Sequence, residues 1–137
     1  MENSRDNITQ IQIAETFMKK NMKNRFLEIL KKKDRSNLRK FISKENYINW
    51  INIYTAPFEE KSAIFRKYNI TDFTPVFILS ESITFNEKIL HLGDAIEEIV
   101  GREITSIVSI IPGKLALYES ETEFSGFILS EPWLRKS

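Results

Sequence analysis

The chain has 137 residues, of which 42% are hydrophobic and 28% charged, and its formal net charge is +1. These proportions are those of an ordinary globular protein, and the length predicts a single domain spanning residues 1–137. The absence of cysteine excludes a disulfide framework, a thiol nucleophile and thiolate metal ligands. No apolar run approaches the roughly 18 residues of a membrane span, and the first ten residues contain no apolar stretch, so we expect a cytoplasmic protein.

Apolar residues at helical spacing predict a first helix that begins at Asp6 or Asn7 and ends in the cluster Lys31-Lys32-Lys33. Asp34 is expected to cap a short second helix. Ser43 is expected to cap a third, although the second and third could also form one bent helix. The apolar face of the third helix would contain Tyr47, Trp50, Ile51 and Tyr54.

A fourth helix is expected to start at Pro57, because proline favours the first helical turn. After Asn69 the pattern changes, and residues 76–79 form a candidate buried strand. Residues 83–85 and 88–90 flank Asn86-Glu87 and suggest a hairpin. Asp94 and Glu97 have the spacing of a capping box, which predicts a short helix that stops at Gly101.

Three apolar runs between residues 103 and 129 are separated by Pro112-Gly113 and by the polar tract 119–123. They predict three consecutive antiparallel strands. The first run has apolar residues on both parities, so we expect both faces of the sheet to be covered over part of their area. The expected fold is α+β, with an N-terminal helical layer on a mainly antiparallel C-terminal sheet and the 94–100 helix inserted between strands.

Charge is unevenly distributed along the chain. Residues 19–44 contain eleven Lys or Arg and two Asp or Glu, a net of +9, whereas residues 45–137 carry a net of −6. Opposite fields on one small domain can steer charged partners to different faces. The basic segment could contact phosphates through Lys31, Lys32, Lys33, Arg35, Arg39 and Lys40. In the other interpretation, these residues cover the solvated faces of amphipathic helices and the nearby aromatics fill the core.

Residues able to support catalysis are sparse. His91 is the one histidine, and between Leu90 and Leu92 it is expected to have a structural role near a strand end. Glu97 and Glu98 are adjacent on a helix and point about 100° apart, so they do not form an acid–base pair. The four glycines lie too far apart for a phosphate-binding loop. We therefore expect no catalytic residue, no metal site and no cofactor.

The C-terminal third contains LGDAIEEI at residues 92–99, followed by IVSIIPGKLALYE at residues 107–119. This helix-then-hairpin pattern resembles small bacterial immunity proteins of contact-dependent inhibition systems. The resemblance implies a protein that binds a cognate toxin and blocks it without catalysis, and it transfers no binding residue by position.

The expected function is therefore a non-enzymatic immunity protein that neutralises a bacterial toxin, possibly a nuclease, by direct binding. Because the active clefts of nucleases are basic, the expected contact surface is acidic. Its residues would be Glu119, Glu121 and Glu123, with Glu97 and Glu98 as further candidates. The alternative is a nucleic-acid-binding or regulatory protein that uses the basic helices of residues 19–44.

Overall fold

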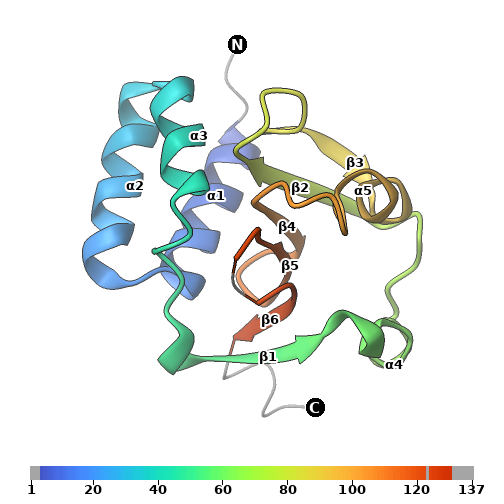
Figure 1. Cartoon of the computed structure of the whole chain (residues 1–137). Coiled ribbons are helices and arrows are strands. Elements are labelled where there is room, and N and C mark those ends of the chain that lie inside the picture. The colour runs from blue at the N-terminus through green and yellow to red at the C-terminus, as the bar shows by residue number, and fades with distance from the viewer. Residues whose placement is uncertain (1–3, 123, 131–137) are drawn as a thin grey trace.

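A computed structural model describes residues 4–122 and 124–130 and has an α+β fold (Figure 1). The α-helices are α1 (Ser4–Phe17), α2 (Lys20–Lys32), α3 (Arg35–Ser43), α4 (Lys61–Lys67) and α5 (Leu92–Ile99). The strands are β1 (Ile53–Pro57), β2 (Pro75–Ser80), β3 (Ile89–His91), β4 (Ser106–Ile111), β5 (Leu115–Glu119) and β6 (Gly126–Ser130). Two 3₁₀ turns, Trp50–Asn52 and Phe58–Glu60, flank β1.

The six described strands form one antiparallel sheet in the order β1-β6-β5-β4-β2-β3. The predicted strands of residues 103–129 are confirmed as β4, β5 and β6, and the predicted strand 76–79 is confirmed within β2. Val108 pairs with Leu117, and Leu117 pairs with Phe127. These consecutive strands therefore form the centre of the sheet, as the turn signals between them predicted.

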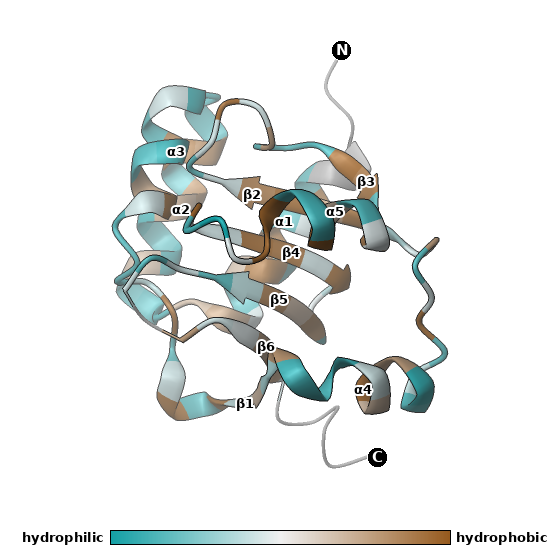
Figure 2. Cartoon of the chain, turned by 45° about the vertical axis from the view of Figure 1, so that its right-hand side comes forward, coloured by the Kyte–Doolittle hydropathy of each residue, from teal (hydrophilic) through white to brown (hydrophobic). Residues whose placement is uncertain are grey.

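Both faces of the sheet are buried. Leu79, Ile107 and Tyr118 face the core under α1, α2 and α3, and each is fully buried. Ile78 and Val108 face the opposite core, which α4 and α5 cover. Side chains alternate between the two faces of a strand, so neighbouring apolar residues each find a hydrophobic layer. Figure 2 shows the corresponding run of hydrophobic residues through the central strands.

The predicted single helix over residues 7–33 is wrong, because the chain breaks between α1 and α2. Met18 forms an isolated antiparallel bridge with Ile48. The amide of Lys19 donates to the carbonyl of Tyr47 over 2.8 Å, and the amide of Asn49 donates to that of Phe17 over 2.8 Å. This pairing with a distant segment replaces helical hydrogen bonds, which periodicity within one segment does not reveal.

The predicted third helix is also wrong. Glu45 has a left-handed backbone with φ of 56°, and the following residues run through a 3₁₀ turn into β1. The spacing of Tyr47, Trp50 and Tyr54 suits a helix, but the side chains have unlike environments. Tyr47 is fully buried, whereas Tyr54 is 44% exposed on an edge strand. The first strand of the sheet thus comes earlier in the chain than we expected.

Two smaller predictions need correction. Residues 81–87 form turns, and only residues 89–91 pair with β2, so the predicted hairpin is wrong in its first strand. The helix expected to be capped by Asp94 begins at Leu92, with His91 as its N-cap, and Asp94 lies in its first turn. Its end near Gly101 is as predicted, within two residues.

Other expectations are confirmed. Asp34 caps α3, since its carboxylate accepts a hydrogen bond from the Asn37 amide over 3.1 Å. A helical segment follows Pro57, with a 3₁₀ turn from Phe58 and α4 from Lys61, but Pro57 itself is the last residue of β1 and not part of the first helical turn. Within residues 4–122 and 124–130, no helix combines the length and the apolar character that a membrane crossing requires.

Candidate protein-binding surface

The centre of the candidate site is the carboxylate of Glu45, which lies between α3 and the sheet and is only 8% exposed. It accepts hydrogen bonds from the hydroxyls of Thr105, Ser120 and Thr122 over 2.9, 2.8 and 2.8 Å. It also accepts from the backbone amides of Glu121 and Thr122, each over 3.3 Å. Glu45 therefore connects the end of the helical layer to the start of β4 and to the β5–β6 turn.

The electrostatics of Glu45 follow from these contacts. Burial opposes ionisation, but the hydrogen bonds from Ser120, Thr122 and Thr105 stabilise the charged form. Together with the bond from the Glu121 amide they outweigh burial, so the pKa of Glu45 is lower than its ordinary value. Glu45 is consequently a carboxylate at neutral pH and orders the donors around it.

Glu119, at the end of β5, is also buried and is only 4% exposed. Its carboxylate accepts from the amides of Gly101 and Glu103 over 3.1 and 3.4 Å. Burial raises the pKa of Glu119, the two amides partly offset this, and the nearby charge of Glu103 adds to the increase. The contact places the segment after α5 beside the β5–β6 turn.

A third carboxylate completes this region. Glu81, just after β2, accepts from the amide of Thr105 over 2.8 Å, and Ser106 donates to Ser80 over 2.8 Å. The ends of β2 and β5 and the start of β4 thus carry a connected polar network. We call this region the acidic end of the sheet, defined by Glu45, Glu81, Glu103, Glu119 and Glu121.

The acidic residues predicted from sequence have different environments. Glu121 is exposed at the β5–β6 turn, and Glu97 and Glu98 are exposed on α5. Glu119 is buried and bound to backbone amides, so its role here is to support the turn, and its carboxylate is withdrawn from the surface. Glu123 lies outside the described residues.

Sequence reasoning missed Glu45. It directly follows a strongly basic segment and resembles an ordinary solvated acid, with no neighbouring motif to single it out. The polar tract 119–123 contains two hydroxyl donors, Ser120 and Thr122, but its own glutamates are acceptors, so the tract gave no sign of a distant acceptor. Because Glu45 and Ser120 are 75 positions apart, that acceptor could not be identified from the sequence.

The basic residues predicted to bind phosphate differ in exposure and in their contacts. Lys31, Lys32, Lys33 and Lys40 are exposed and Arg39 is half-buried. The Nε of Arg35 lies 2.9 Å from Glu87 Oε2, in an ion pair with the loop before β3. The opposite carboxylate oxygen of Glu87 accepts from Gln10 over 3.2 Å. Arg35 therefore has a contact that ties α3 to α1 and the sheet.

A shallow groove of about 300 Å³ lies between α2 and α3. Three cationic residues and one acid line it: Arg25, Lys40, Lys44 and Glu28. The aromatic residues that follow the basic segment do not lie there as exposed rings, as stacking on bases would require. Tyr47 is fully buried and donates to the Ile42 carbonyl over 2.8 Å, and half-buried Trp50 packs against Tyr118.

His91 ends β3 and is exposed, with its ring 5.9 Å from that of Phe73. Its position at a strand end is as expected. Among the residues that the structure describes, no three His, Asp or Glu side chains are grouped so as to hold a metal ion. The structural role expected for His91 stays a prediction.

Charge separates in part across the molecule. Lys20, Lys31, Lys32, Lys33 and Lys40 are exposed on α2, on α3 and between them, and Glu97 and Glu98 are exposed on α5. Lys67, Lys88 and Lys114 are exposed outside the α2–α3 side. Comparison of the chain with protein-family models, with curated proteins and with solved structures found no match.

Proposed function

We propose that this chain is a non-enzymatic inhibitor, of the immunity-protein type, which binds a toxin protein through the acidic end of the sheet. The observation that carries the proposal is the anchoring of residues 120–122 by Glu45. An inhibitor that acts by binding benefits from a surface already held in its bound conformation, because less conformational entropy is lost on association. The anchored turn supplies such a surface.

The second support is the distribution of charge. Glu97, Glu98 and Glu103 are exposed on α5 or just after it, and Glu121 is exposed at the β5–β6 turn, with Arg102 as one exposed cation among them. The buried carboxylate of Glu45 adds negative charge beneath the turn. A nuclease binds its anionic substrate in a basic cleft, so an acidic plug is electrostatically complementary to it. About 800 Å² per partner is enough for a stable interface, and a chain of this size can provide it.

The test is growth rescue. The toxin domain encoded beside this gene is expressed in a sensitive host with and without this chain. We expect rescue by the natural chain and by Glu59→Lys, in which the same charge change is made at an exposed position in the 3₁₀ turn before α4. Glu121→Lys should reduce the rescue. Failure of the natural chain to rescue growth would refute the proposed function, whereas equal rescue by all three proteins would move the interface away from the turn.

Nucleic-acid binding is a second candidate, favoured by one observation, the groove between α2 and α3 with Arg25, Lys40 and Lys44 on its walls. Phosphate contacts by such residues would give affinity without sequence preference. We rank this candidate second because the ion pair of Arg35 and the burial of Tyr47 remove two groups that it would use.

A further inference from the structure

Strand β1 forms one edge of the sheet and pairs on one side with β6, from Ile53 opposite Ser130 to Pro57 opposite Gly126. Within residues 4–122 and 124–130 no strand pairs with its other side. An edge strand offers a row of backbone donors and acceptors to any further strand that can align with it. Proteins usually protect such edges with charged side chains, with short strands or with bulges.

The β1 edge has little of this protection. Residues 46–58, which contain the first 3₁₀ turn, the whole strand and Phe58, include no charged residue. Pro57 at the end of the strand, and Glu59 and Glu60 in the turn after it, are the protecting features present. The opposite edge differs, since β3 is only three residues long and follows Glu87 and Lys88. The two edge strands therefore differ in length and in flanking charge, and β1 is the edge better able to pair with a further strand.

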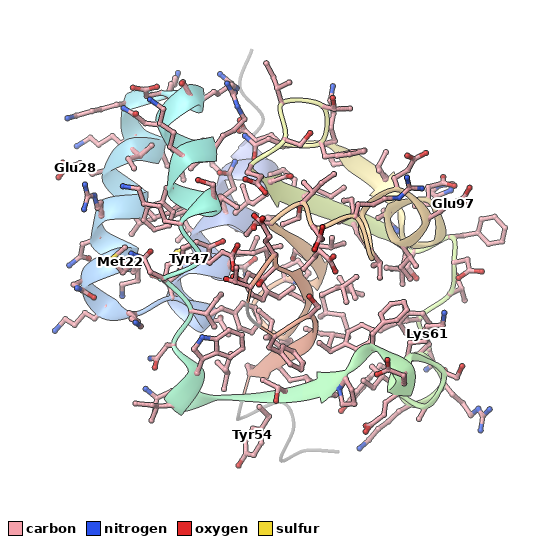
Figure 3. The ribbon with its side chains drawn as sticks, in the orientation of Figure 1. Met22, Glu28, Tyr47, Tyr54, Lys61 and Glu97 are labelled. Carbon is pink, nitrogen blue, oxygen red and sulfur yellow. The ribbon has the colours of Figure 1, made fainter. Side chains whose placement is uncertain are left out.

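Apolar side chains accompany the open edge. Ile51, in the 3₁₀ turn that leads into β1, is 92% exposed, and Tyr54 is 44% exposed. Figure 3 shows the ring of Tyr54 projecting from β1 away from the body of the molecule. Burial of such side chains would add hydrophobic free energy to the backbone hydrogen bonds of a new strand pair.

We propose that the outer edge of β1 pairs with β1 of a second copy of this chain, antiparallel and around a twofold axis, so that two six-stranded sheets join. The neutrality of the edge favours this occupant. Two copies repel where their basic α2–α3 sides meet, but identical uncharged strands meet without repulsion. Phe73, Ile83 and Ile89 are also exposed, but they lie in or near the short β3 edge beside charged Glu87 and Lys88. This inference does not depend on the proposed function.

The twofold axis sets a register. In a five-residue strand the midpoint is Thr55, so each Thr55 faces Thr55 of the second copy and Ile53 faces Pro57. Thr55 is exposed in the single chain. A charged residue at position 55 would therefore meet its own copy at close range, and like charges directly opposite one another destabilise a strand pair.

The experiment is sedimentation equilibrium of the purified full chain up to about 1 mM, a range that detects weak dimers. We expect the average mass to rise with concentration from 16.1 kDa toward twice that value. Thr55→Lys and Thr55→Glu should each weaken dimerisation about tenfold or more. An equal mixture of these two variants should restore it, because opposite charges then face one another. Ser62→Lys, at an exposed position on α4, should dimerise like the natural chain.

A natural chain that stays monomeric throughout this range would overturn the proposal. So would a Thr55→Lys variant that dimerises as well as the natural chain. Two monomeric variants whose mixture stays monomeric would overturn the Thr55-centred pairing. Circular dichroism of each variant establishes that it is folded, and the mixture tests the pairing itself, because an unfolded variant could not regain a dimer through opposite charge.

Discussion

The hydroxyl of Ser120 donates a hydrogen bond to the carboxylate of Glu45 over 2.8 Å, and the two residues are 75 positions apart in the chain. Through this bond and the bonds from Thr122 and from the Glu121 amide, Glu45 holds the β5–β6 turn in place. Glu45 directly follows the basic segment of residues 19–44. The two oppositely charged parts of the chain are therefore coupled through a buried acid.

Replacement of Glu45 by Gln should lower the free energy of unfolding by about 2–4 kcal/mol. The new amide group would direct N–H donors at the hydroxyls and amides that now donate to the carboxylate, and buried donors would lose their acceptor. Urea denaturation measures the change. The matched control is Glu121→Gln at an exposed position, which should lie within about 0.5 kcal/mol of the natural chain. An equally small change in Glu45→Gln would contradict the anchoring role of Glu45.

The two buried carboxylates should give opposite pH dependences. The pKa of Glu45 is lower in the folded chain than its ordinary value of 4.5, so its contribution to stability is complete above that value and is lost as the pH falls below it. The pKa of Glu119 is raised above 4.5, so the folded chain holds its proton more tightly. Ionisation of Glu119 therefore reduces stability as the pH rises from 4.5 through the folded pKa.

Stability measured by urea denaturation across this pH range separates the two contributions. Glu45→Gln should flatten the loss of stability on the acid side of 4.5, and Glu119→Gln should flatten the decrease above it. If Glu119→Gln instead steepened the decrease above 4.5, the raised pKa of Glu119 would be wrong.

Gly126 should not tolerate a side chain. A Cβ added there would lie 2.5 Å from Cζ of Phe124 and 2.6 Å from the backbone oxygen of Ala56. The backbone contact cannot be relieved by a rotamer change, and the strain should cost about 1–3 kcal/mol in Gly126→Ala. Thermal unfolding measures this loss, with Ser62→Ala on α4 as a control at an exposed position. Unchanged stability would show that β1 and β6 pair less closely than described.

The chain should not bind nucleic acid at micromolar concentration. In a gel shift at about physiological ionic strength we expect no complex with duplex or single-stranded DNA or RNA. Micromolar binding that weakens steeply with salt, and that is lost in the triple variant of Arg25, Lys40 and Lys44 to Gln, would favour the second candidate function instead.

Much of the fold could be predicted because its signals are local. Val108 and Ile107 point to opposite faces in any strand, and Pro112-Gly113 marks the turn between β4 and β5 wherever the rest of the chain lies. Asp34 caps α3 through an amide three positions away. Such features depend only on neighbouring residues.

The errors arose where distant segments override local preference. Helical spacing continues through Met18, but Ile48 pairs with it, and spacing from Tyr47 to Tyr54 suits a helix although β6 takes residues 53–57 into the sheet. At the candidate site the sequence showed the exposed Glu121 but misjudged Glu119, because the amides of Gly101 and Glu103 that bury it come from another element.

The central claim is tested most directly by the association rate of the purified chain with the toxin domain encoded beside it, measured by surface plasmon resonance at low and physiological salt. We predict tight binding whose association slows as salt rises, and a clearly slower association for Glu121→Lys than for Glu59→Lys, most marked at low salt. The absence of any complex between the two natural proteins would contradict the proposed function.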